Sequence, residues 1–248
     1  MCLIVFAWRP EHPQPLLLAA NRDEFHARPC QALGEWPQAP GLLAGRDLQG
    51  GGTWLGVDAA GRFAALTNIR DPGQQEGARS RGELVADYLQ GGLTPADYLQ
   101  QIRARLDSYS GFNLLLGDRQ RLYHFNSREA EGRALEAGVY GLSNAGLDTP
   151  WPKLLRAREA LRQRLDQANP DTLLELLADR EQAVDTQLPQ TGVSLEVERL
   201  LSSVFITSPG YGTRASTALI LQADGGQQIV ERSFGADGRQ TGEVRVRR

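Results

Sequence analysis

The second residue of the chain is the first candidate for chemistry. Cys2 directly follows Met1, the only methionine. Initiator methionine is normally removed before a residue as small as cysteine, so we expect the mature chain to begin with a thiol and a free α-amino group on one residue. An α-amine with a pKa of about 7.7–8.0 accepts a proton at neutral pH, and a thiol of pKa about 8.5 is already slightly ionised. This pair predicts an N-terminal nucleophile with its own base; the alternative is a buried apolar cysteine.

A polar cluster follows the predicted second strand. Asn21, Arg22, Asp23 and Glu24 come directly after an apolar run, and the first hairpin returns the chain so that they lie near Cys2. A carboxylate there would hold and orient a terminal ammonium, and a guanidinium would lower the thiol pKa or hold a substrate carbonyl. The alternative is a solvated charged turn, although the cluster interrupts a pattern that is otherwise apolar.

Three further positions offer donors at strand ends. Thr67-Asn68 ends one buried strand and Ser143-Asn144 ends another, while Arg214 stands at the start of a C-terminal strand. Asparagine amides at such places can donate to an oxyanion, but asparagine is also a common turn residue. Arg214 would support the same site or be a surface charge.

Other chemistries lack the residues they need. The run Gly50–Gly52 lacks the lysine and the following helix of a phosphate-binding loop. His12, His26 and His124 are too scattered for a metal site, so no metal is expected. His26 and Cys30 are four residues apart and could offer axial ligands to haem, but a coincidence within a loop is the preferred interpretation.

The elements that must position these residues follow from hydrophobic periodicity and turn signals. Strands are predicted over Leu3–Trp8, Leu16–Ala20, Thr53–Val57, Arg62–Ile69, Phe112–Leu116, Leu122–Phe125, Val139–Leu142, Ser203–Thr207, Ser216–Leu221, Gln227–Phe234 and Gly242–Val246. Helices are predicted over Arg81–Leu89, Pro95–Leu106, Trp151–Gln167 and Pro170–Arg180, with a loop over Gln182–Ser194. Because strands and helices come in blocks, we expect a layered α+β fold with largely antiparallel sheets, and one domain over residues 1–248.

Composition limits the partners and the cellular location that we expect. The net charge of −3 argues against a nucleic-acid partner, which needs a basic face. No signal peptide opens the chain and no stretch approaches the roughly 20 apolar residues of a membrane span, so a cytoplasmic location is expected. With two cysteines in a reducing compartment, a Cys2–Cys30 disulfide is disfavoured. All but one of the 27 basic residues are arginine, the exception being Lys153.

Several short motifs occur in one order along the chain. They are Met1-Cys2, Asn21-Arg22-Asp23-Glu24-Phe25, Gly51-Gly52-Thr53-Trp54-Leu55-Gly56, Ala65-Leu66-Thr67-Asn68, Arg81-Gly82-Glu83-Leu84-Val85, Gly111-Phe112-Asn113-Leu114, Tyr140-Gly141-Leu142-Ser143-Asn144 with Thr149-Pro150-Trp151, and Pro209-Gly210-Tyr211-Gly212-Thr213-Arg214. Together they resemble the NRDE family, also called the transport and Golgi organization protein 2 family. The resemblance implies kinship with N-terminal-nucleophile (Ntn) hydrolases of the choloylglycine hydrolase and penicillin V acylase type. It therefore implies an αββα sandwich, with two mainly antiparallel sheets between helical layers.

The resemblance also implies roles for residues. Cys2 would be the nucleophile, Asp23 would hold its amine, Asn144 and Asn68 would donate to the oxyanion, and Arg214 would support the site. A ligand-binding role is expected for Asn21, Thr53, Trp54 and Ser143. Trp151 could be a second aromatic of the cleft, and both tryptophans could instead be core residues.

One position departs from the hydrolase pattern. The hydrolase branch has an arginine three residues before its aspartate, where this chain has Ala20. Arg22 is adjacent to Asp23, and because neighbours on a strand point to opposite faces, we expect Arg22 to point away from the thiol.

Two functions therefore stay open. The first is a thiol amidohydrolase that acts on a small amide or acyl compound after Met1 is removed and requires no cofactor. The second is a non-catalytic carrier of haem or of an acyl-coenzyme A or lipid ligand in the same cleft, since the resemblance links members to haem movement and lipid homeostasis. The oligomeric state is not indicated.

Overall fold

Two stacked antiparallel sheets form the centre of the molecule. The computed structural model describes residues 2–248. In the first sheet the strands lie in the order β10 (Gly138–Leu142), β1 (Cys2–Trp8), β2 (Leu16–Phe25), β11 (Tyr211–Leu221), β12 (Gln227–Phe234) and β13 (Gln240–Arg247). In the second they follow chain order: β3 (Cys30–Trp36), β4 (Ala39–Asp47), β5 (Leu55–Val57), β6 (Phe63–Asn68), β7 (Phe112–Gly117), β8 (Leu122–Asn126) and β9 (Glu131–Ala134).

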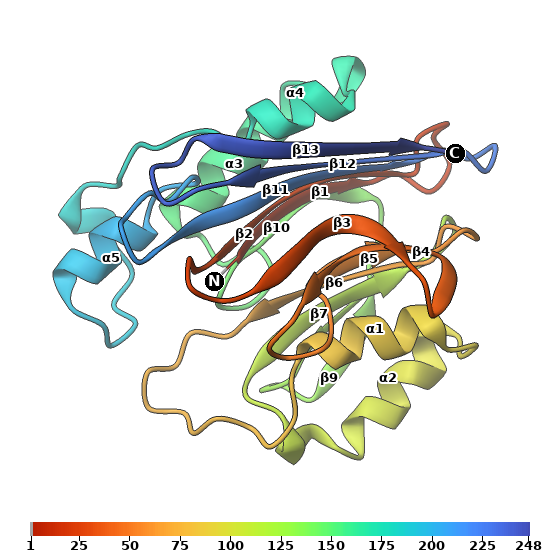
Figure 1. Ribbon diagram of the computed structural model, residues 1–248, viewed down its shortest axis with the longest axis horizontal. Helices are drawn as coiled ribbons and strands as arrows, with labels where there is room; N and C mark the ends of the chain where they lie inside the picture. Colours follow the sequence, from red (N-terminus) through yellow and green to blue (C-terminus); the bar gives the residue numbers. More distant parts are fainter. Residues whose placement is uncertain (1) are drawn as a thin grey trace.

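Helices cover the outer face of each sheet (Figure 1). The first sheet is covered by α3 (Pro152–Arg162) and α4 (Pro170–Glu175), with α5 (Leu195–Leu201) beyond one end of it. The second sheet is covered by α1 (Gly82–Gln90) and α2 (Pro95–Arg103). This confirms the predicted α+β class and the αββα arrangement. Within residues 2–248, none of the helices has the length and apolar character needed to cross a membrane.

The alternation of β1 and β2 assigns each side chain to one of two cores. Ile4 and Phe6 pack between the two sheets, whereas Leu3 and Val5 pack against the helices that cover the first sheet. Strands buried on both faces read as continuous apolar runs, which is why the first hairpin is recognisable from sequence. The same alternation decides on which side of the sheet each polar residue of β2 lies.

The second strand is longer than predicted. The sequence indicates an end at Ala20, but β2 continues through Asn21, Arg22 and Asp23 to Phe25. All three polar residues are at most 5% exposed. The first three residues of the polar cluster are therefore a buried part of the sheet and not a solvated turn, and Glu24 follows them half-buried on the same strand.

Other boundaries differ for physical reasons. Strands β3, β4 and β9 have no counterpart in the prediction; β3 and β9 lie at the sheet edges and carry exposed polar residues. The strand predicted over Ser203–Thr207 is wrong: its apolar residues are buried in the connection after α5. Helices α3 and α4 end earlier than predicted, and the predicted loop Gln182–Ser194 includes a short 3-10 turn.

Candidate active site

Cys2 begins β1 and borders a cavity of about 470 Å³. In the antiparallel pairing of β1 with β2, Cys2 lies directly opposite Arg22. The cavity wall also includes Asp23, Thr53 and Asn68, and its outer part is formed by the segment 76–82. A polar cavity of this size suits a small molecule. Cys2 and Cys30 are both free thiols, so the two do not form a disulfide.

The surroundings of Cys2 favour the protonated thiol. Burial raises its pKa and the Asp23 carboxylate raises it further, while Arg22 and a hydrogen bond from the Asp23 main-chain N–H lower it. The balance lies above the ordinary value, because an ionised sulfur is poorly solvated in this position. A nucleophilic role for Cys2 therefore requires a base that takes the thiol proton during attack.

Arg22 shares the face of the sheet on which Cys2 lies. Its guanidinium stacks over the Trp54 ring at 4.3 Å and lies 3.7 Å from the Glu24 carboxylate and 3.9 Å from that of Asp47. Its Nη1 is buried with no hydrogen-bond partner in the described part of the chain. The expectation that Arg22 points away from the thiol is wrong, because direct cross-strand partners project to the same face.

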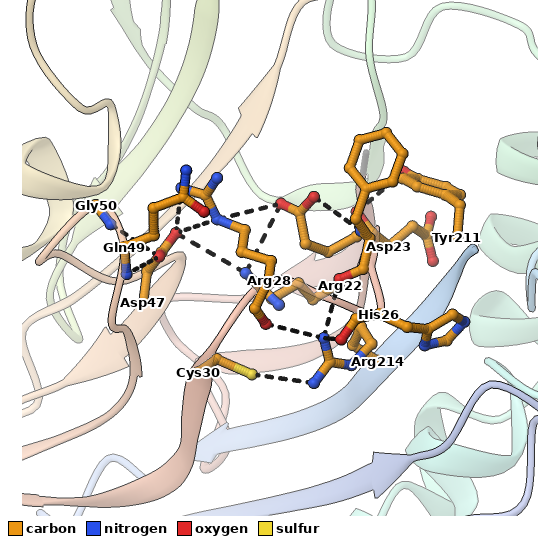
Figure 2. Close-up of polar contacts among 12 residues, drawn as sticks. Arg22, Asp23, His26, Arg28, Cys30, Asp47, Gln49, Gly50, Tyr211 and Arg214 are labelled. Carbon is orange, nitrogen blue, oxygen red and sulfur yellow. Dashed lines mark hydrogen bonds and ion pairs between the residues drawn. The ribbon is translucent and has the colours of Figure 1, made fainter.

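Asp23 lies on the opposite face of β2, toward the helices. Its Oδ1 accepts a hydrogen bond of 2.7 Å from the Thr213 hydroxyl, and its carbonyl accepts one of 3.0 Å from the Tyr211 hydroxyl. Figure 2 shows Tyr211 beside it. Burial raises the pKa of the carboxyl, and Lys153 is the largest of the influences that lower it. Asp23 is therefore held rigidly beside the start of β1.

The two strand-end asparagines occupy different positions. Asn68 lines the cavity. Asn144 is 1% exposed and donates from Nδ2 to the Asn68 carbonyl at 2.8 Å, so one of its N–H groups ties the segment after β10 to the end of β6. Ser143 donates to the Cys2 carbonyl at 3.0 Å and fixes the start of β1 from the other side.

Arg214 holds the loop that follows β2. It donates from Nη1 to the carbonyls of Phe25, His26 and Arg28, and from Nη2 to the Cys30 sulfur (Figure 2). It is not among the residues that line the cavity. Its contacts are those of a loop anchor.

Several other predicted residues also have structural partners. The Asn21 amide donates to carbonyls of the helical layer, those of Leu177 and Val204, at 3.0 and 2.8 Å. His26 contacts the Ser208 carbonyl at 3.2 Å, and neither His26 nor Cys30 lines the cavity. Thr53 and Trp54 do line the cavity, whereas Trp151 does not. Within residues 2–248, no three His, Cys, Asp or Glu side chains gather as a metal site requires.

Arginines and acids form the outer rim of the cavity. Arg28 pairs with Asp47 at 2.8 Å and approaches Glu24 at 3.8 Å (Figure 2). Burial would raise the pKa of Asp47, but hydrogen bonds from the Gly50 N–H and from Arg28 lower it overall. Burial lowers the pKa of Arg81, which donates to the Gly111 carbonyl at 3.1 Å. Sequence reasoning assigned no role to Arg28 and Asp47, because nothing in their spacing distinguishes them.

The triple glycine closes the loop between β4 and β5. Gly51 has φ +79°, and its N–H donates to the Asp47 carbonyl at 2.8 Å. A Cβ on Gly52 would lie 2.2 Å from the Gly82 carbonyl carbon at the start of α1. The run is therefore needed for a tight turn and a close backbone approach.

Two antiparallel sheets stacked between helical layers, with the first strand beginning at Cys2, define the fold of Ntn hydrolases. The C2A mutant of the conjugated bile acid hydrolase from Clostridium perfringens has a similar fold: its TM-score is 0.55 at 6% identity, over 99% of this chain and 92% of that one. An N-acylethanolamine-hydrolyzing acid amidase orthologue of Caenorhabditis elegans aligns with a TM-score of 0.49 at 10% identity, covering 88% of this chain and 92% of that one.

The chain belongs to the Transport and Golgi organisation 2 family, whose family pattern matches residues 1–236. The Transport and Golgi organization protein 2 homologs of Bos taurus and Homo sapiens are each 36% identical to it, over 94% of this chain and 93% of theirs. The Drosophila melanogaster protein is 27% identical over 94% of this chain and 92% of its own.

Proposed function

We propose that this protein is a thiol amidohydrolase that acts on a small amide or acyl compound once Met1 is removed. The observation that carries the proposal is the position of Cys2, which begins the first strand, borders the cavity and lies directly opposite Arg22. The Ntn-hydrolase fold supports the same reaction class, in which an N-terminal residue is both nucleophile and base.

The proposed reaction has two halves. The Cys2 α-amine takes the thiol proton while the sulfur attacks the substrate carbonyl carbon, forming a C–S bond and an oxyanion. When the oxyanion collapses, the C–N bond breaks and the leaving nitrogen takes the proton from the ammonium. A water molecule, deprotonated by the same amine, then attacks the thioester; the C–S bond breaks, the acid leaves and the thiol is restored.

The surrounding residues have proposed parts in this reaction. Asn68, on the cavity wall, donates to the oxyanion, and Asn144 fixes it through the hydrogen bond to its carbonyl. Arg22 favours the thiolate form of Cys2 that develops during attack. Asp23 holds the terminal amine.

The charged side chains at the rim of the cavity favour a polar substrate. Arginine and carboxylate side chains both line the cavity, and its apolar lining includes Trp54 and Leu66. Charged rim residues can orient a polar head group. A long acyl chain lying against the same side chains would leave their charges without polar partners.

Mass spectrometry of the intact chain tests the premise. The expected mass is that of a chain beginning at Cys2, because a chain that keeps Met1 has no free amine on the nucleophilic residue. Finding Met1 on a protein that still hydrolyses amides would contradict the proposed base.

A pair of cysteine variants tests the nucleophile. Turnover of a panel of acyl amides should be lost in Cys2→Ala and kept in Cys30→Ala, since Cys30 lies outside the cavity wall. A thioester intermediate, seen as a mass increase on Cys2 alone, would support the mechanism. Equal turnover in Cys2→Ala and the unmodified protein would overturn it.

Non-catalytic binding is the second candidate, and the volume of the same cavity favours it. The ligand would be haem, with Cys2 as the soft donor, or an acyl ligand with an anionic end that meets Arg28 or Arg81. Titration of haem into the protein, followed by absorbance, would show a shifted spectrum that Cys2→Ala abolishes. A spectrum equal to that of free haem at stoichiometric protein would exclude haem as the ligand.

A further inference from the structure

The chain's only lysine is buried next to the start of β1. Lys153 is the second residue of α3, which packs on β1 and β10, and the residue is 1% exposed. Its Nζ has no hydrogen-bond partner among residues 2–248. Burying an ammonium without a hydrogen bond is costly, so its position calls for an electrostatic reason.

The ionisable groups that act on Lys153 come from four other segments. They are Asp23 on β2, Cys2 on β1, Arg70 after β6 and Glu198 on α5. Arg70 and Glu198 form their own ion pair at 2.8 Å, with both side chains nearly buried. Asp23 is thus the carboxylate with the largest electrostatic influence on Lys153, and both side chains are 1% exposed, Asp23 on the face of β2 that the helices cover and Lys153 on the helix that packs there.

We propose that Lys153 is a positioning residue that keeps the Asp23 carboxyl ionised, so that Asp23 can hold the Cys2 amine in place. This proposal rests on the proposed function, because the amine exists on Cys2 only after Met1 is removed. Lys153 touches no reacting atom; it acts through Asp23.

The electrostatics of Asp23 support this role. Burial alone raises the pKa of its carboxyl, and a protonated carboxyl could not accept from a terminal ammonium as a carboxylate does. Lys153 is the largest influence in the opposite direction, ahead of the hydrogen bond from Thr213. The lysine therefore opposes the effect of burial on the aspartate, whose pKa remains above its ordinary value.

Lysine also makes the cluster sensitive to pH. Burial lowers the pKa of Lys153 to about 8, although Asp23 opposes the change. Above that pH the ammonium loses its proton and Asp23 loses its counter-charge. We therefore expect turnover to fall above pH 8. The midpoint of this fall in the pH–rate profile reflects Lys153 and Asp23 together, because the two groups titrate as a coupled pair.

Because the chain has one lysine, its titration can be observed alone. Protein made with ¹³C-labelled lysine should give a single Lys153 Cε signal that titrates near pH 8. In Asp23→Asn the midpoint should fall by about one pH unit or more, since an attractive charge is gone. The matched control is Glu24→Gln, whose carboxyl follows Asp23 on the strand but is not among the main influences on Lys153.

Three results would overturn the proposal. They are a Lys153 midpoint near the ordinary 10.5, a midpoint unchanged in Asp23→Asn, and an equal change in Glu24→Gln. If Asp23→Asn does not fold, Thr213→Val removes the hydroxyl that stabilises the carboxylate and should shift the same midpoint in the same direction.

Turnover separates this proposal from the proposed function. Lys153→Met should lower turnover about tenfold or more, and Lys153→Arg should restore it while abolishing the fall above pH 8, because arginine stays charged. Absence of turnover in the unmodified protein would refute the amidohydrolase function and leave the lysine titration to decide the Lys153–Asp23 coupling. Normal turnover in Lys153→Met would refute the positioning role alone.

Discussion

Replacing Lys153 by arginine should change how the free energy of unfolding depends on pH. The pKa of Lys153 is about 8 in the folded protein against 10.5 in an unfolded chain. A folded pKa below the unfolded one means that the unfolded state binds more protons between these values, so stability rises with pH there. The difference between the two pKa values corresponds to roughly 3 kcal/mol of destabilisation at neutral pH. About 2–3 kcal/mol of this destabilisation disappears as the pH rises from 7 to 10.

In Lys153→Arg the free energy of unfolding no longer rises with pH through loss of the Lys153 proton, while the other titrating groups are unchanged. The guanidinium remains charged throughout the range, so its burial is as costly at pH 10 as at pH 7. Any packing change from the larger head group shifts both measurements equally and cancels. Tyrosines such as Tyr98 and Tyr109, whose pKa values are raised by burial, titrate in both proteins and cancel as well.

Urea unfolding followed by circular dichroism measures the difference. As the pH rises from 7 to 10, the free energy of unfolding of the unmodified protein should increase by about 2–3 kcal/mol relative to that of Lys153→Arg. A difference that stays constant over this range would refute the reasoning, since it would mean that Lys153 keeps its proton in the folded state. The lysine signal observed by NMR must show the same midpoint, because both report the same proton.

Three further changes probe the surroundings of the site and the opposite sheet. Gly45→Ala should cost about 1–3 kcal/mol in urea unfolding, since its Cβ would lie 2.3 Å from the Trp54 ring; an unchanged midpoint would contradict that contact. Arg22→Met should slow alkylation of Cys2 by iodoacetamide at pH 7.5 about threefold to tenfold, because it removes a charge that lowers the thiol pKa; an unchanged rate would show that the guanidinium does not act on the sulfur. Burial lowers the pKa of His124 to about 4, so its contribution of about 3 kcal/mol should be present above pH 6.5 and lost as the pH falls toward 4; in His124→Gln this part of the acid dependence should disappear, and its persistence would refute the assignment.

The hairpin that carries the site is predictable because its strands are apolar on both faces. The end of β2 is not, because Asn21 and Asp23 resemble turn residues. Their partners lie far along the chain: the carbonyls of Leu177 and Val204 for Asn21, and the Thr213 hydroxyl for Asp23. A polar run reads as a strand only when such distant partners are known.

Residue type and position along the chain indicate some of the residues at the site but not others. Cys2, Asp23 and Asn68 line the cavity, as their positions near strand ends suggest. Arg214 faces a loop, which spacing cannot reveal. Lys153 stands out in the sequence only as an exception of composition, and its partner Asp23 is 130 positions away on β2, so spacing does not connect the two.

The place of the missing hydrolase arginine can be understood from the register of β1 and β2. Ala20 lies opposite Ile4, and Arg22 lies opposite Cys2. Residues two apart on a strand share a face, so an arginine at position 20 and the arginine at position 22 would enter the same side of the sheet, one pleat apart. The chain thus keeps a guanidinium on the thiol's face, next to Cys2 rather than next to Ile4, where the inter-sheet core begins. Alternation then directs Asp23 toward the helices, and the helix that packs on β1 carries Lys153, whose ammonium acts on this carboxylate from that side.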